Sequence, residues 1–254
     1  MQVTLTSPQG DTLDLTSDGA VFVPEGALTT LVGSVSRSDT TVPGRHGARP
    51  GKPVVQPIQT TVDFYLHTTK TTTMPETYAR FYDFWDLDRD TVLEAHTDHP
   101  LSPLFLTMRL HQTLPGLRKD KRDLDELTVP VQVFAKDGVF WTEPDHRGGT
   151  VTLTNTGDVT IHPEIRWTGP GGTVTTPSQA TFTLPPVAAP RRVLIDAGES
   201  CVVLDDQGVR DDALSAVVSP QVFPEATPKR MSSTWVLPDG AELWWRTGIL
   251  NPWR

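Results

Sequence analysis

The stretch Ser233–Arg254, STWVLPDGAELWWRTGILNPWR, decides the fold class of this chain. It holds four tryptophans in short apolar runs around a Pro-Asp-Gly turn. Short aromatic runs bounded by turn residues are typical of β-strands. We therefore expect the closing strands of a β-sandwich. Adjacent residues of a strand point to opposite faces, so at most one of Trp244 and Trp245 lines the core.

The stretch Thr150–Gly172, TVTLTNTGDVTIHPEIRWTGPGG, carries the same kind of pattern. An alternating run leads to an Asn-Thr-Gly turn, and a second alternating run ends at Trp167, which predicts a hairpin. Further strands are expected at intervals of roughly ten residues, as in a sandwich or barrel, with no helix longer than one turn. The strands predicted in this half are Thr150–Leu153, Glu164–Trp167, Thr181–Leu184, Arg192–Ile195, Cys201–Leu204, Ala216–Val218, Ser233–Val236 and Glu242–Trp245.

The N-terminal half also favours strands. In Thr60–Leu66 the residues Val62, Phe64 and Leu66 alternate with polar ones, which indicates a strand with one buried face. The other strands predicted here are Gln2–Leu5, Leu13–Leu15, Val21–Val23, Leu104–His111 and two within Val129–Trp141.

One helix is expected, between Pro75 and Asp88. Thr73 suits the N-cap position, and Pro75 and Glu76 suit the first turn. Its aromatic residues, which fall at helical spacing and favour a core-facing stripe, are Tyr78, Phe81, Tyr82 and Trp85.

The chain is expected to divide into two domains. A polar, glycine-bearing stretch at 144–149 reads as a short linker. This predicts an N-terminal β-domain with one helix at 1–145, and a C-terminal β-sandwich at 146–254.

Composition limits the class of function. The chain has 254 residues, one cysteine, Cys201, and no stretch apolar enough to span a membrane. Residues 1–20 lack a secretory signal pattern, so we expect folding in a reducing cytoplasm without disulfides. With 22 basic and 31 acidic residues the net charge is −9, which opposes sustained binding to phosphate backbones.

Several short motifs resemble catalytic or metal sites, but their surroundings argue against them. Arg45-His46-Gly47 matches the start of the histidine-phosphatase signature, yet a polar turn precedes it where that chemistry needs a buried strand. Asp86–Asp90 copies the first ligands of an EF-hand, but Thr91 and Thr97 replace the required glycine and glutamate. His96 with His99, and the acidic pairs at 205–206 and 211–212, lack the spacing of a metal site. We expect no cofactor, no metal and no enzymatic activity.

The tryptophans allow two interpretations. Flat aromatic rings form stacking platforms for sugars, which favours a carbohydrate-binding module. Aromatic residues are also enriched in cores and protein interfaces, and this second interpretation suits strands of a sandwich. In this second interpretation, the candidates for exposed aromatic contact are Trp244, Trp245 and Trp253.

The order of these features resembles the distal tail proteins (Dit) of long-tailed bacteriophages. The segments that carry the resemblance are Val35–Gly47 (VSRSDTTVPGRHG), the strand Thr60–Leu66, the helix, the Asn155-Thr-Gly turn with Pro163, Glu164–Pro170, Val193–Gly198, Trp235–Gly240 and the final Trp-Arg. The resemblance implies an N-terminal β-domain that assembles into a hexameric ring, and a galectin-like C-terminal β-sandwich that projects outward.

The same resemblance implies partners and a place in the virion. The ring joins the tail tube protein to the tail-tip hub or baseplate, DNA passes through its lumen without specific binding, and the outer domains hold receptor-binding proteins. Such a protein is assembled in the host cytoplasm, is not inserted in a membrane, and ends in the virion tail tip. In this chain Arg45 and His46 then become loop residues at a subunit interface. A lectin-like module that contacts the host surface remains the alternative.

Overall fold

The computed structural model describes residues 1–16, 19–41, 43–44, 46–116, 120, 124–196 and 198–254. They form two compact units, the first made of Met1–Thr142 with Ile249–Arg254 and the second of Glu143–Gly248. The predicted division placed all residues after 145 in the second domain, whereas in the structure Ile249–Arg254 belong to the first unit. Ile249 is buried in the first core, and the ring N–H of Trp253 donates to the Leu31 carbonyl at 3.0 Å.

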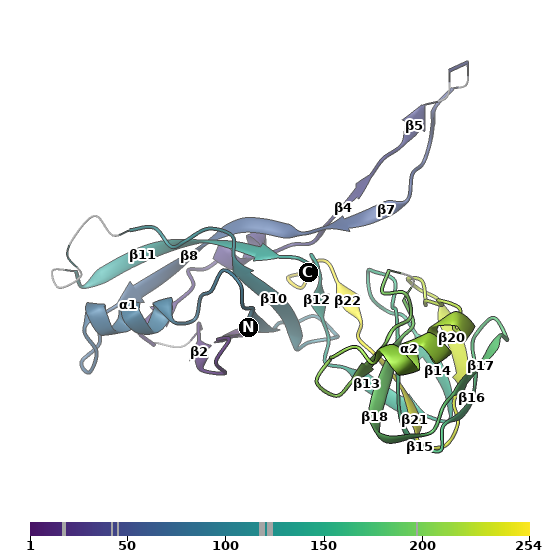
Figure 1. The fold of residues 1–254 in the computed structure, drawn as a ribbon. Helices are drawn as coiled ribbons and strands as arrows, with labels where there is room; N and C mark the ends of the chain where they lie inside the picture. The colour runs from purple at the N-terminus through teal and green to yellow at the C-terminus, as the bar shows by residue number, and fades with distance from the viewer. Residues whose placement is uncertain (17–18, 42, 45, 117–119, 121–123, 197) are drawn as a thin grey trace. The chain divides into compact units, whose positions relative to one another are not determined.

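The first unit is built on one large antiparallel sheet (Figure 1), in the order β2-β1-β9-β10-β11-β8-β3, with β12 paired to β10 and β22. Its strands are β1 (Gln2–Thr6), β2 (Thr12–Asp14), β3 (Val21–Phe22), β8 (Ile58–His67), β9 (Thr91–His96), β10 (Leu104–Leu110), β11 (Glu126–Ala135), β12 (Phe140–Trp141) and β22 (Gly248–Ile249). A short 3-10 helix, η1 (Ala27–Thr30), precedes the segment that leaves this sheet.

The longest ladder joins β8 to β11 and runs from Ile58 opposite Ala135 to His67 opposite Glu126. Alternation along β8 follows the sequence pattern, since Val62, Phe64 and Leu66 are buried while the residues between them are more exposed. The predicted strand is thus confirmed, and it extends further at both ends. β9 was not predicted, although it is the strand that joins β1 to β10.

Helix α1 (Met74–Tyr82) is shorter than expected. The N-terminus forms as predicted, because the Glu76 carboxylate accepts from both the N–H and the hydroxyl of Thr73 at 2.8 Å. These bonds hold the pKa of Glu76 below its ordinary value. The helix ends at Tyr82 rather than Asp88 because the next turn tightens, with Trp85 N–H donating to the Tyr82 carbonyl.

Between η1 and β8 the chain forms a two-stranded ribbon that projects from the large sheet of the first unit (Figure 1). We call Ser34–Gln56 the arm. Its inner ladder pairs β4 (Ser34–Arg37) with β7 (Pro53–Gln56), and its outer ladder pairs β5 (Thr40–Thr41) with β6 (Ala48–Arg49). The sequence pattern did not predict these strands.

The second unit is a sandwich of two antiparallel sheets over one core, as predicted. The β21 sheet has the order β13-β21-β15-β18-β19, and the β20 sheet has the order β14-β20-β16-β17. Their strands are β13 (Asp145–Gly148), β14 (Thr150–Thr154), β15 (Glu164–Gly169), β16 (Gly172–Thr175), β17 (Thr181–Leu184), β18 (Val187–Leu194), β19 (Val203–Asp205), β20 (Ser232–Val236) and β21 (Ala241–Trp245).

Two predictions for this unit were wrong in detail, the hairpin within Thr150–Gly172 and the strand Ala216–Val218. The runs within Thr150–Gly172 do not form a hairpin, because β14 pairs with β20 while β15 pairs with β18 and β21 in the facing sheet. The Pro-Asp-Gly turn connects the two sheets. Ala216–Val218 belongs to a helix, α2 (Asp212–Val218), which continues into the 3-10 helix η3 (Ser219–Gln221).

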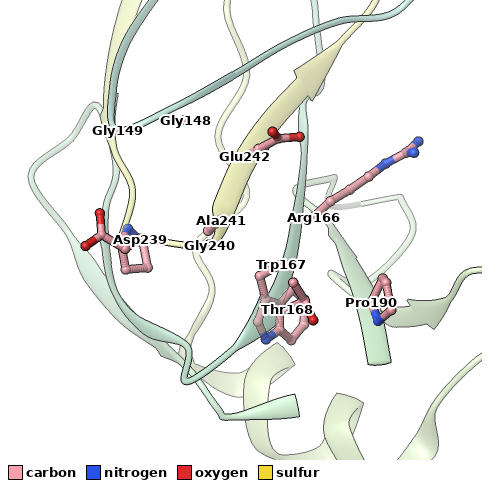
Figure 2. A pocket seen from close by; sticks show the side chains of 11 residues that line it. Gly148, Gly149, Arg166, Trp167, Thr168, Pro190, Asp239, Gly240, Ala241 and Glu242 are labelled. Atoms are coloured by element: carbon pink, nitrogen blue, oxygen red, sulfur yellow. The ribbon is translucent and has the colours of Figure 1, made fainter. Parts of the chain in front are cut away.

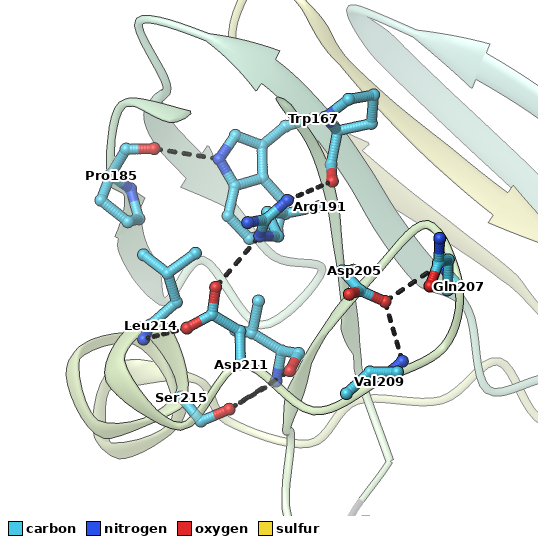
Figure 3. Close-up of polar contacts among 11 residues, drawn as sticks. Trp167, Pro185, Arg191, Asp205, Gln207, Val209, Asp211, Leu214 and Ser215 are labelled. Atoms are coloured by element: carbon cyan, nitrogen blue, oxygen red, sulfur yellow. Dashed lines mark hydrogen bonds and ion pairs between the residues drawn. The ribbon is translucent and has the colours of Figure 1, made fainter. Parts of the chain in front are cut away.

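Helix α2 forms because its first turn is capped (Figure 3). The Asp211 carboxylate accepts from the Leu214 N–H at 3.0 Å and pairs with Arg191 at 3.1 Å. The hydrogen bond from Leu214 is the largest cause of the lowered pKa of Asp211. The Ser215 hydroxyl accepts from the Val203 N–H, so the capped helix also closes the outer edge of β19.

Replacing Asp211 with alanine is expected to lower the thermal midpoint of the second unit by a few degrees, because the cap and the ion pair are lost. Asp211→Asn is the matched control, since asparagine caps but does not titrate. A lowered pKa means that the carboxylate stabilises the fold above its ordinary pKa and ceases to do so below the folded one. Melting curves of the wild type and the alanine variant should therefore begin to converge below about pH 4 and coincide only below the folded pKa of Asp211. Equal midpoints at neutral pH would contradict this account.

Candidate interaction surfaces

The arm is the most exposed element of the first unit. All four residues of β4 and the paired residues of β5 and β6 are exposed, and the large side chains Val35 and Val54 are 49% and 55% accessible. Its sequence holds four basic side chains (Arg37, Arg45, Arg49, Lys52) and one acidic one (Asp39), a net charge of +3. The whole chain carries −9, which leaves −12 on the rest. The arm is thus a basic projection on an acidic protein.

The root of the arm is tightly packed. The Gly33 N–H donates to the Leu250 carbonyl at 2.7 Å, and a Cβ on Gly33 would lie 2.3 Å from the Gly138 carbonyl oxygen. Gly138 has φ +63°, and its own Cβ would lie 2.0 Å from the Gln56 carbonyl oxygen. Glycine is required at both positions, and the backbone contact that it permits holds the arm at a defined place.

A second close contact connects the two ladders of the arm. The Gly51 N–H donates to the Asp39 carboxylate at 2.8 Å, and a Cβ on Gly51 would lie 2.1 Å from the Ser38 carbonyl oxygen. Of the predicted interface pair, His46 lies exposed between β5 and β6, and Arg45 lies outside the described residues. Their contact with another subunit stays a prediction.

Trp244 lies on the outer face of the β21 sheet, between groups from both neighbouring strands. The ring of His146, opposite it on β13, stacks on the indole with centroids 4.2 Å apart and an interplanar angle of 11°. From β15 on the other side, the guanidinium carbon of Arg166 lies 3.8 Å from the ring centroid. The indole N–H donates to Glu242 at 3.0 Å, and Arg166 is held in turn by Glu164. Both faces and the polar edge of the ring are therefore occupied.

This arrangement bears on the two interpretations of the tryptophans. A sugar platform needs a free ring face, and Trp244 offers none. Trp245 points the other way and packs against the sandwich core, so the two side chains divide between the faces as expected. Trp253 is partly buried against the first core, in edge contact with Phe140 at 5.8 Å. A role of these rings in contacts with other proteins stays a prediction.

A shallow hollow of ≈ 530 Å³ lies on the second unit beside this stack (Figure 2). Arg166 and Glu242 reach it from adjacent strands, and Asp239 reaches it from the turn before β21. The first two are already engaged with the Trp244 cluster, as described above. The side chains of Arg166 and Glu242 are therefore engaged with Glu164 and Trp244, which do not line the hollow.

The weaker motifs have structural explanations. The Asp86 carboxylate accepts from the Asp88 N–H at 2.9 Å and from Arg89 at 2.7 Å, which closes the turn after α1. Asp205 accepts from two backbone N–H groups of the loop that follows it (Figure 3). His96, at the end of β9, contacts Glu94 at 2.7 Å. Within the part of the chain that the structure describes, no three metal-ligating side chains gather, and no helix is long and apolar enough to cross a membrane.

No known protein-family model and no curated protein sequence matches this chain. Solved structures do match in fold. The Dit protein of phage SPP1, described as a paradigm of the hub adsorption apparatus in phages that infect Gram-positive bacteria, superposes with a TM-score of 0.59 at 12% identity, over 97% of this chain and 98% of that one.

The chain has the fold of a phage tail hub protein. The baseplate of phage P2 in its activated conformation with Ca gives a TM-score of 0.52 at 11% identity, over 97% of both chains. A chain of the same baseplate with Sr gives a TM-score of 0.51 at 12% identity, over 96% of this chain and 97% of that one. These matches extend over both units, and they confirm the mainly β fold class and the resemblance drawn from the sequence.

Sequence reasoning missed two features of these surfaces. The sequence shows that basic residues are concentrated in the arm. The strands of the arm are too polar to show an alternating pattern, so the sequence did not predict them. The cluster of His146, Trp244 and Arg166 joins residues from three strands, so it depends on a register that no local pattern reveals.

Replacing Arg166 with alanine is expected to destabilise the second unit by about 1 kcal/mol, because the cation over the indole and the ion pair with Glu164 are lost together. Arg246→Ala, at an exposed position just after β21, is the control and should cost less. Urea unfolding followed by far-UV circular dichroism measures both. Equal effects of the two substitutions would show that the cluster contributes nothing specific.

Proposed function

We propose that this protein is a distal tail hub, which forms a hexameric ring between the tail tube and the tail tip or baseplate and leaves a channel for DNA. The observation that carries the proposal is the fold match to a hub protein over nearly the full length of both chains. At 12% identity the two chains share the fold.

The first unit supplies the ring contacts in this proposal. An isolated two-stranded ribbon is only marginally stable in water, and the arm has neither a third strand nor a helix over it in the described residues. A neighbouring subunit is a fitting cover, because the arm is basic and the rest of the chain is acidic. Head-to-tail contact between two different surfaces of one chain closes into a ring. In this proposal His46, which is exposed between β5 and β6, and Arg45, which precedes it in the sequence, contact the neighbour.

The net charge suits a channel through which DNA moves. A protein that grips DNA uses lysine and arginine to neutralise phosphates, whereas this chain outside the arm carries a charge of −12. A lumen wall of this character repels the backbone and allows passage.

The second unit, which we propose to be galectin-like, serves as the attachment point for adsorption or receptor-binding proteins. The protein would then act in the virion tail tip after assembly in the host cytoplasm, with a structural and not a catalytic role. The occupied faces of Trp244 argue against the alternative of a lectin-like module that stacks sugars on this ring.

The ring is tested by light scattering and negative-stain imaging of the purified protein at micromolar concentration. A sixfold ring with a central opening is the expected result. A monomer that persists at low and moderate salt would contradict the proposal.

The arm is tested by substitution. Arg45→Ala with His46→Ala is expected to weaken the ring, and the charge reversal of Arg37, Arg49 and Lys52 to glutamate is expected to abolish it at low salt. Arg210, Arg230 and Arg246, three exposed arginines of the second unit, give a control with the same change of charge. If this control dissociates the ring to the same degree, net charge rather than the arm governs assembly.

A further inference from the structure

The edges of the two sheets in the second unit differ in how they are protected. The β21 sheet has β19 and β13 as its edge strands. The edge of β19 is covered by the loop before α2, where the Asp211 N–H donates to the Val203 carbonyl. The edge strand β13 carries the charged or titratable residues Asp145, His146 and Arg147. In the β20 sheet, β17 has α2 beside it and two prolines after it. Charges, prolines and covering elements are the usual means by which proteins block strand addition. β14 has none of them.

The hydrogen bonds of β14 show which backbone groups face outward. The Asn155 N–H donates to the Met231 carbonyl and the Leu237 N–H donates to the Gly149 carbonyl, so the odd-numbered residues from 149 to 155 bond to the β20 side. Antiparallel pairs alternate, and the N–H and C=O groups of Thr150, Thr152 and Thr154 therefore point away from β20. No described residue bonds to these groups. They form a regular row of free donors and acceptors.

The side chains beside this row are uncharged. Val151 and Leu153 are buried in the core, while the three threonines are exposed on the outer face. Cross-strand hydroxyl contacts fix the face, with Thr152 to Thr234 at 3.3 Å and Thr154 to Ser232 at 2.9 Å. The outer face continues with further hydroxyls and without a charge: Thr173, Thr175, Thr181 and Thr183.

We propose that β14 is a docking edge that accepts an extended, uncharged segment of another protein as an added antiparallel strand. The chemistry of the edge selects this partner, because only an extended peptide backbone presents donors and acceptors at the matching spacing. A charged segment would find no complementary charge on this surface. A second copy of this chain is disfavoured too, since pairing two β14 edges would bring together two units of net charge −5. The inference does not depend on the hub role.

The test uses the intact chain and a fluorescein-labelled peptide with the sequence SSTWVL, copied from Ser232–Leu237, which already pairs with β14 in the fold. Saturable binding by fluorescence anisotropy is expected, with no binding of a scrambled peptide. Thr152→Pro removes one outward N–H without touching the ladder to β20, and it should weaken binding about tenfold or more. Thr152→Val keeps the backbone and removes the hydroxyl, and it should bind like the wild type.

Hydrogen exchange on the wild type provides a readout that needs no substitution. The amides of Thr150, Thr152 and Thr154 should exchange rapidly in the free chain and become protected with the peptide, whereas those of Val151 and Leu153 should be protected throughout. Unchanged exchange at the threonines, or equal binding by Thr152→Pro and Thr152→Val, would overturn the proposal. A change in the oligomeric state of Thr152→Pro without peptide would assign the edge to a second copy instead, and would also overturn it.

Discussion

The return of the chain end to the first unit is the constraint on which the rest of the structure depends. Ile249 enters the first core, the Leu250 carbonyl accepts the Gly33 N–H, and the Trp253 ring bonds to Leu31. These contacts make the second unit an insertion that the first unit both begins and closes. The contact between Gly33 and Leu250 also forms part of the root of the arm, where the backbone of Gly33 and Gly138 packs too closely for a side chain. The ending of the chain thus determines both the division into units and the position of the most exposed element.

The sandwich achieves its stability by interlocking distant strands. Consecutive strands repeatedly fall in opposite sheets, as β14 and β15 do and as β20 and β21 do, so each sheet draws on segments from both ends of the unit. One lateral side is covered by α2, and the other carries the segment from β13 to β14, which changes sheets at Gly149. This asymmetry leaves β14 as an edge on which the sheet can be extended, and the Trp244 cluster as a rigid patch on the opposite sheet.

Charge distribution connects the two units to the proposed role. The basic arm stands on an acidic chain, which suits contacts between copies and discourages retention of DNA. The uncharged threonine face of the β20 sheet suits contacts of another kind, in which backbone hydrogen bonds rather than charges decide the partner. In the proposed hub role, the arm would serve self-assembly and the edge strand β14 would serve attachment.

The sequence by itself determined the mainly β class, the buried face of β8, the start of α1 and the presence of short tryptophan-bearing strands, because these depend on local alternation, capping and turn residues. Tertiary structure decided which strands pair, since pairing joins residues far apart in the chain. It therefore decided that the runs around Asn155 form no hairpin, that Ala216–Val218 is helical against β19, and that the chain end returns to the first unit. It also decided the question of Trp244 and Trp245. The alternation of a strand assigns them to opposite faces, but only the sheet order, with β13 and β15 on either side of β21, encloses Trp244 between His146 and Arg166.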